Sequence, residues 1–337
     1  MGDISCRIEN TSGIITLQRP QSLNALTYDM CSQIETSLIE WKSNKDVSVV
    51  IIEAEGDKAF CAGGDVAQLY HRGRANDLKY INNFWKDEYR LNAMIANYPK
   101  PYIAFMNGYN MGGGVGISCH GSHRIVGESS KIAMPECAIG LIPDVGGTLL
   151  LAKSPGKLGE LLGTTGIRME SLEAIKTGFA DYFVPEKHWE ELKKKIISSG
   201  TIDNIKNYCE KPPIIESNLF NKLNEINEYF KSETVYDIEK NLKNSNNDFT
   251  KKILKMWKKN SPLSIFCTIE IIKKVRKNPK IEFALEQEFI FTSNSIKHGD
   301  FLEGVRAALI DKDHNPKWKH ENIYEIDAED KKLLLGK

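Results

Sequence analysis

Two glycine-rich stretches, far apart in the sequence, carry the residue types that bind a negatively charged oxygen. The first spans residues 58–65 and the second spans residues 107–116. Glycines in a turn that leads from a strand into a helix let backbone N–H groups approach an oxygen, because no Cβ is in the way and the helix start is electropositive. Two such turns predict an oxyanion hole.

Two acidic residues follow the second stretch. Glu136 and Asp144 each lie beside a proline, and an apolar run separates them. Burial in such surroundings raises a carboxyl pKa toward the range of a general acid or base. Donors for an oxyanion together with poised carboxylates indicate chemistry at an acyl carbonyl.

At these residues the chain resembles the crotonase (enoyl-CoA hydratase/isomerase) superfamily, and within it the 3-hydroxyisobutyryl-CoA hydrolase branch. The similarity runs from residues 14–20 and 24–26 to residues 301–313, so it covers nearly the whole chain. The resemblance implies an α/β crotonase fold, a spiral of repeated strand-strand-helix units followed by a helical C-terminal part.

The resemblance also implies roles for residues in the two glycine-rich stretches. Ala62 and Gly113 would supply the two backbone donors that hold a thioester carbonyl oxygen. Loss of one such donor lowers a rate by roughly 10²- to 10³-fold. The alternative is that both turns only let strands and helices pack closely, which the match to two motifs at family spacing disfavours. The neighbouring residues expected to bind substrate are Gly63, Gly64, Asp65 and Gly112.

Glu136 and Asp144 match the two acidic positions of the hydrolase branch. As a base, Glu136 would take a proton from the water that attacks the thioester carbon; as a nucleophile, it would form a mixed anhydride that water then hydrolyses. The sequence leaves both open. Asp144 is implied to orient the 3-hydroxyl of the substrate, with capping of the following helix as the alternative.

Gly116 and Glu88 discriminate between branches of the superfamily. Typical enoyl-CoA hydratases place a glutamate at the position of Gly116, where it shares a water with the later glutamate. A glycine there counts against a hydratase. Glu88 matches a substrate-contacting position of the hydrolase branch, and its alternative reading is an exposed helical acid.

We therefore predict an enzyme that hydrolyses a short β-hydroxyacyl-CoA thioester, 3-hydroxyisobutyryl-CoA above all, as in valine catabolism. One alternative is an enoyl-CoA hydratase/isomerase that uses one carboxylate, and another is a non-catalytic acyl-CoA-binding protein. No cofactor is expected, since coenzyme A is part of the substrate. Its phosphates need cations, and the candidates by residue type alone are Arg19, Lys58, Lys273 and Lys274.

Composition agrees with a small-molecule enzyme. Forty-five basic and 45 acidic residues cancel, which disfavours a nucleic-acid partner. No apolar run is long enough to span a membrane, and the seven cysteines form no C-x-x-C pair. Cys119, His120 and His123 are expected to pack in the core, so no metal site is predicted. We expect a cytoplasmic protein, or a mitochondrial-matrix one if it is eukaryotic with its presequence absent, and leave homo-oligomerisation open.

Hydrophobic periodicity predicts the elements that position these residues. A hairpin is expected near residues 6–17, then a helix capped by Thr27 that buries Met30 and Trp41, then a strand at residues 47–52. The further elements are expected at residues 102–106 (strand), 111–119 (helix), 123–126 and 131–134 (strands).

Composition changes at residue 185, where the glycine-rich half ends and a Lys-, Glu- and Asn-rich half with helical spacing begins. We therefore predict a catalytic core at residues 1–185 and a helical region at residues 186–337 that completes the acyl pocket and assembly surface. Residues 241–248 are expected to form an exposed loop, and the residues after Trp318 a loosely held tail.

Overall fold

The structure, a computed structural model, describes residues 2–214 and 219–336 and contains two compact units. Unit 1 comprises Met1–Asp65, Asp87–Ala133 and Arg168–Glu216, and unit 2 comprises Val66–Lys86, Met134–Ile167 and Ser217–Lys337. This division differs from the predicted single boundary at residue 185, because segments from the first half of the sequence pack with the C-terminal helices.

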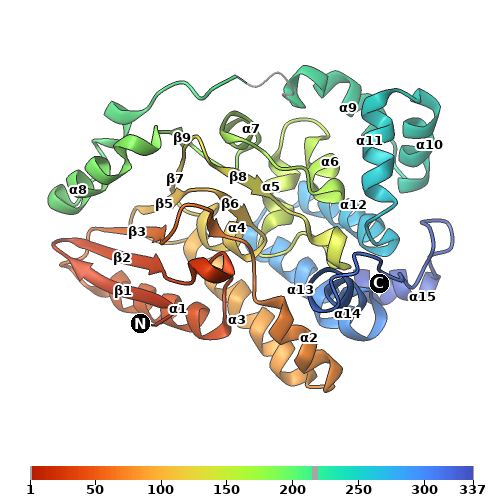
Figure 1. Cartoon of the computed structure of the whole chain (residues 1–337), viewed down its shortest axis with the longest axis horizontal. Helices are drawn as coiled ribbons and strands as arrows, with labels where there is room; N and C mark the ends of the chain where they lie inside the picture. Colours follow the sequence, from red (N-terminus) through yellow and green to blue (C-terminus); the bar gives the residue numbers. More distant parts are fainter. Residues whose placement is uncertain (1, 215–218, 337) are drawn as a thin grey trace. The chain divides into compact units, whose positions relative to one another are not determined.

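Unit 1 is built on a six-stranded sheet with the strand order β1-β2-β3-β5-β7-β9 (Figure 1). β1 and β2 form the predicted antiparallel hairpin, and the remaining neighbours are parallel. The strands are β1 (Ile4–Glu9), β2 (Ser12–Leu17), β3 (Val49–Ala54), β5 (Tyr102–Met106), β7 (His123–Val126) and β9 (Tyr182–Phe183).

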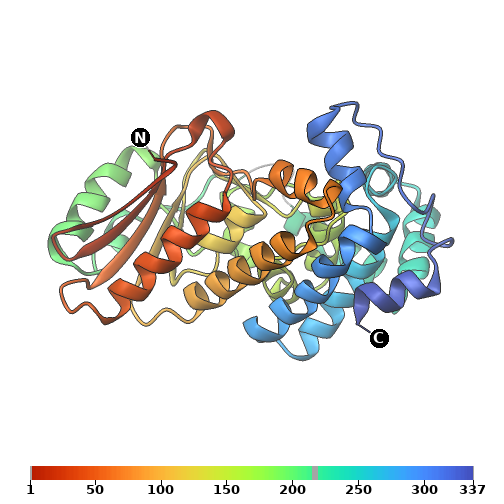
Figure 2. The same ribbon diagram turned by 90° about the horizontal axis from the view of Figure 1, so that it is seen from below.

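Helices cover both faces of this sheet, as Figure 2 shows for green α8 (Trp189–Ser199) and red α1 (Tyr28–Ser43). On one face, Trp189 and Leu192 of α8 pack against alternate strand residues such as Ile51 and Phe105. On the other, Trp41 of α1 lies so close to Gly13 that a Cβ there would come within 2.4 Å of the indole. Every residue of β2 and β5 is buried, as expected for strands that are covered on both faces of the sheet.

A second, three-stranded parallel sheet in unit 1 carries both glycine-rich stretches. It consists of β4 (Ala59–Cys61), β6 (Tyr109–Met111) and β8 (Lys131–Ala133), and β6 leads directly into α4 (Gly113–Ser118). The other helices of unit 1 are α7 (Ser171–Thr177) and the second half of α3 (Leu78–Ala96).

Unit 2 is helical. α5 and α6 pack against α12, and α2 packs against α14. Apart from the first half of α3, its helices are α2 (Val66–Arg74), α5 (Gly147–Lys153), α6 (Leu158–Thr165), α9 (Leu223–Phe230), α10 (Val235–Ser245), α11 (Asp248–Trp257), α12 (Pro262–Lys277), α13 (Ile281–His298), α14 (Phe301–Val305) and α15 (Ala328–Leu335).

Two predictions for this half are wrong. The expected loop at residues 241–248 is mostly the last turn of α10, and only Asn246, in the left-handed conformation, and Asn247 connect it to α11. The expected loose tail contains α15, whose Leu334 and Leu335 are buried and which packs on α13. The Asn-rich composition of residues 241–248 marks the short connection between α10 and α11, but it does not show that the first five of these residues are helical.

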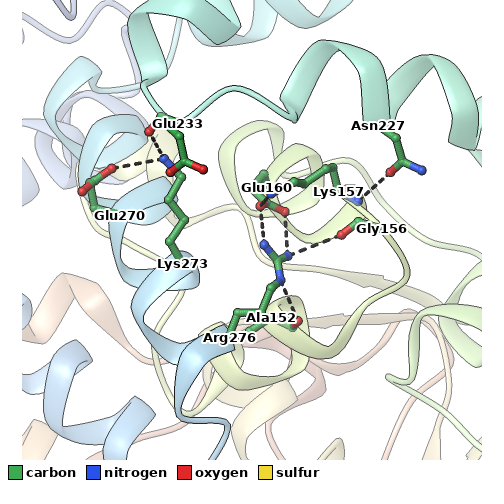
Figure 3. Close-up of polar contacts among 9 residues, drawn as sticks. All are labelled: Ala152, Gly156, Lys157, Glu160, Asn227, Glu233, Glu270, Lys273 and Arg276. Atoms are coloured by element: carbon green, nitrogen blue, oxygen red, sulfur yellow. Dashed lines mark hydrogen bonds and ion pairs between the residues drawn. The ribbon is translucent and has the colours of Figure 1, made fainter.

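An ion pair between the partly exposed Arg276 and the fully buried Glu160 ties α12 to α6 within unit 2 (Figure 3). Arg276 forms two bonds to Glu160, of 2.6 and 2.9 Å, and Lys157 approaches the same carboxylate at 3.0 Å. Arg276 also donates to the carbonyl of Ala152 at 3.2 Å. Although burial opposes it, these cations lower the pKa of Glu160.

We expect Arg276→Met to lower the free energy of unfolding by about 3 kcal/mol, because it leaves the buried Glu160 carboxylate with Lys157 alone. Lys273→Met is the matched control on α12, since among the described residues Lys273 donates to the carbonyl of Glu233 and, at 3.4 Å, to the Glu270 carboxylate, which is not fully buried. It should change stability by less than about 1 kcal/mol. Urea unfolding above pH 6 measures both; equal effects would contradict the prediction.

Candidate active site

Leu26 and Arg19 hold the first glycine-rich turn in place. The Leu26 N–H donates to Gly63 at 2.9 Å and its carbonyl accepts from the Asp65 N–H at 2.7 Å. Arg19 donates to the carbonyl of Ala25 at 2.6 Å and to the Asp65 carboxylate at 3.3 Å. Arg19 therefore braces the turn, and its contact with a coenzyme A phosphate stays a prediction.

The amide of Ala62, predicted as the first oxyanion donor, is used inside the protein. It donates to the carbonyl of Leu23 at 2.9 Å, so it is not available to a ligand. This corrects the assignment of the donor within the motif. The Gly64 N–H, two residues further on, meets no acceptor among the described residues.

The second turn brings Gly113 next to Gly64 and Glu88. Gly112 has a φ of 49° and Gly113 is the first residue of α4. A Cβ built on Gly113 would lie 3.2 Å from the Gly64 nitrogen and 3.0 Å from Oε1 of Glu88. No acceptor among the described residues takes the Gly113 N–H either. Two amides that no described acceptor takes and one carboxyl thus lie close together around Gly113.

Glu88 is buried, with 3% of its surface exposed, on the half of α3 that belongs to unit 1. The alternative reading as an exposed helical acid is therefore wrong. Burial raises the pKa of the neighbouring Cys61 thiol to about 12, and the charge of Glu88 adds to this effect. Cys61 is consequently a neutral thiol and no nucleophile.

Unit 2 holds the two predicted catalytic carboxyls. Glu136 begins the 3-10 helix Glu136–Ile139, which ends at Gly140 with a φ of 72°. A Cβ on Gly140 would lie 2.4 Å from the Asp300 carbonyl oxygen, so only glycine fits. This turn fixes the Glu136 side chain, which is 5% exposed. Its Oε2 meets no partner among the described residues.

The pKa of Glu136 is raised well above its ordinary value, first by burial and then by the charges of Asp144 and Glu288. Asp144 is also 5% exposed. The N-cap of α5 is Gly146, so Asp144 lies two residues before the cap position and the capping alternative is wrong. The structure thus brings the two predicted acids into electrostatic contact.

Glu288 is the third member of this carboxyl cluster and was missed by the sequence prediction. It lies on α13, has no exposed surface, and faces the same side as Ala284 and Phe291. Burial raises its pKa to about 8, with Asp144 adding to the effect. The signal in the sequence was an acid at a core position of an otherwise apolar helical face.

Comparison with known proteins decides the family. The family model described as enoyl-CoA hydratase/isomerase matches residues 12–335. The chain belongs to the enoyl-CoA hydratase/isomerase family. This agrees with the crotonase fold expected from the two glycine-rich stretches.

Individual members of the enoyl-CoA hydratase/isomerase family match over nearly the whole chain. A Bos taurus protein named "3-hydroxyisobutyryl-CoA hydrolase, mitochondrial" is 38% identical over 95% of this chain and 84% of its own length. A Rhodobacter sphaeroides structure titled as an enoyl-CoA hydratase is 43% identical, with a TM-score of 0.94, and covers 99% of this chain and 97% of that chain. A Mycobacterium thermoresistibile structure titled as a carnitinyl-CoA dehydratase is 36% identical, with the same TM-score, and covers 99% and 96%.

The remaining candidates have structural roles in this family member. Lys273 and Lys274 donate to carbonyl and side-chain oxygens of unit 2, and their contacts with phosphate stay predictions. Cys119 is buried, and no group of acidic, histidine or cysteine side chains among the described residues could hold a metal ion. No described helix is long and apolar enough to cross a bilayer.

Proposed function

We propose that the chain hydrolyses 3-hydroxyisobutyryl-CoA, or a close short β-hydroxyacyl-CoA, to the free acid and coenzyme A. The name of the Bos taurus relative, matched over almost the full length, supports this substrate. The observation that carries the chemistry is the pair of buried carboxyls, Glu136 and Asp144, together with a residue at 116 that has no side chain.

In this proposal the thioester carbonyl oxygen accepts hydrogen bonds from the Gly64 and Gly113 amides, which stabilise the negative charge that develops on it. Glu136 acts on the thioester carbon, either by taking a proton from water or by direct attack. Asp144 accepts a hydrogen bond from the 3-hydroxyl. Single turnover in ¹⁸O-water tests the nucleophilic role: if water opens the mixed anhydride at the Glu136 carbonyl, ¹⁸O enters that carboxyl and the product acid carries a Glu136 oxygen. A base leaves Glu136 unlabelled and puts ¹⁸O in the product, as does water attack at the acyl carbonyl of the anhydride, so label in Glu136 establishes the nucleophile and label in the product alone leaves both roles open.

The titles of the two solved structures name hydratase and dehydratase activities. Hydration of an enoyl-CoA is therefore a second candidate function and needs its own test. Hydration of a double bond requires two carboxylates that grip one water, and Gly116 removes the usual partner. Glu88 lies beside Gly113, and its carboxyl is the partner that this alternative would use.

Purified protein is expected to release free thiol from 3-hydroxyisobutyryl-CoA and 3-hydroxypropionyl-CoA, and to leave the absorbance of crotonyl-CoA unchanged. The first substrate pair reports hydrolysis, and the second assay reports hydration. Tight binding without thiol release would support the non-catalytic acyl-CoA-binding protein instead. Loss of crotonyl-CoA absorbance would support the hydratase.

The name of the Bos taurus relative also includes a mitochondrial location. It favours the mitochondrial option for this chain over the cytoplasm. A fluorescent fusion of the complete gene product, imaged with a mitochondrial stain, tests it.

A further inference from the structure

Glu288 binds the backbone that carries Asp144. Its Oε2 accepts from the Gly146 N–H at 2.7 Å, and its Oε1 accepts from the Thr148 N–H at 3.0 Å. The Thr148 hydroxyl donates to the same Oε1. Both carboxyl oxygens of one side chain on α13 thus hold the turn between Asp144 and α5, and all of these residues belong to unit 2.

The turn that Glu288 holds is strained. Val145 has a φ of 52°, a left-handed conformation that is rare for a β-branched residue, and Gly146 follows with a φ of 80°. Such residues keep this conformation only when their surroundings impose it, at an expense of about 1–3 kcal/mol. The three donors bound by Glu288 belong to Gly146 and Thr148, which follow Val145, so this side chain restrains the turn from α13.

Helix packing alone does not call for an acid at this position. A fully buried carboxyl loses its hydration, and an apolar side chain would fill the same helical face without that loss. The compensation for burying Glu288 comes from its three donors. Glu288 therefore fixes the position of the 144–148 backbone. This backbone in turn sets the orientation of the Asp144 side chain.

We propose that Glu288 is a positioning residue for Asp144, and that it sets the preference of the enzyme for acyl groups with a 3-hydroxyl. The inference rests on the proposed function, in which Asp144 accepts a hydrogen bond from that hydroxyl. Glu288 itself takes no part in the reaction and acts through the 144–148 turn. Removing it lets the turn relax and moves the Asp144 carboxylate away from the position that the 3-hydroxyl requires.

The experiment compares kcat/KM for 3-hydroxypropionyl-CoA with kcat/KM for propionyl-CoA, which lacks only the hydroxyl. In the wild type the hydroxylated substrate should be preferred. Glu288→Ala should lower kcat/KM for 3-hydroxypropionyl-CoA by roughly 10- to 100-fold, because small displacements of a positioning group have effects of this size. The value for propionyl-CoA should change little, so the preference collapses.

Three variants accompany Glu288→Ala. Glu288→Gln keeps one acceptor oxygen but turns an NH₂ toward one of the donors, so an intermediate preference is expected. Thr148→Val removes only the hydroxyl donor and should have the smallest effect. Glu286→Gln is the matched control, since Glu286 is an exposed acid on the same helix, and it should keep the wild-type preference. If Glu288→Ala does not fold, Glu288→Gln and Thr148→Val test the inference by the same measurement, the ratio of kcat/KM for 3-hydroxypropionyl-CoA to kcat/KM for propionyl-CoA.

The outcomes separate this inference from the proposed function. A wild type that prefers the hydroxylated substrate, with Glu288 variants that keep the preference, overturns the role of Glu288 alone. Equal losses for both substrates would mean that Glu288 only supports the fold, which also overturns it. A wild type without any preference removes the role of Asp144, and the inference falls with it.

Discussion

Glu136→Gln is expected to lower kcat for 3-hydroxyisobutyryl-CoA by roughly 10²- to 10⁴-fold, the range that a positioned base contributes. The amide has the shape of the carboxyl but can neither take a proton from water nor form an anhydride. KM should change little, because the proposed binding contacts come from Gly64, Gly113 and Asp144. Thiol release under saturating substrate measures the effect, and turnover at the wild-type rate would remove Glu136 from the mechanism.

The pH profile adds a second signature of Glu136. Its carboxyl must be ionised to act, and burial together with Asp144 raises its pKa well above the ordinary value. The wild-type kcat/KM should therefore rise with pH along a limb that lies well above pH 4.5. Because the clustered carboxyls titrate together, this limb reports the group as a whole. In Glu136→Gln the residual rate should no longer follow it.

Gly113→Ala is expected to lower kcat by roughly 10²- to 10³-fold. Its methyl group would lie 3.2 Å from the Gly64 nitrogen and 3.0 Å from Oε1 of Glu88, where the proposed carbonyl oxygen would bind. The methyl group displaces the carbonyl oxygen from between the donors. Thiol release measures kcat, and thermal unfolding checks that the variant is folded.

Gly178→Ala is the matched control for this substitution. Among the described residues, apart from the adjoining backbone, no atom lies within 4 Å of a Cβ built on Gly178, which ends α7 with a φ of 84°. The variant should lose only the modest stability that a left-handed alanine entails and keep full turnover. If Gly113→Ala also kept full turnover, the oxyanion hole would have to be formed by other amides.

The fold could be predicted where local patterns decide it. The runs at Tyr102–Met106 and His123–Val126 are strands over those same residues, as predicted. Runs of four or five residues between turn signals are too short for a helix and have the usual length of a buried strand. The helix that buries Met30 and Trp41 is confirmed as well. The division at residue 185 differs from the structure because packing between distant segments leaves no trace in local composition.

The site could be predicted only to the level of its motifs. The glycine-rich stretches locate the two turns, but which N–H points outward depends on partners elsewhere, here the carbonyl of Leu23 that takes the Ala62 amide. Glu288 is separated from Gly146 by 142 residues. No spacing rule connects an acid on α13 to that turn, although its place on a buried face marks it as unusual.

The interleaving of the two units limits how this protein can be divided. Each unit is made of three separate stretches of chain, so the polypeptide passes repeatedly from one unit to the other before its last stretch, Ser217–Lys337. A gene fragment that encodes only residues 186–337 would lack α2, α5 and α6, on which α14 and α12 pack. Neither unit is thus encoded by one continuous stretch of the gene, so neither can be expressed or recombined as a single segment.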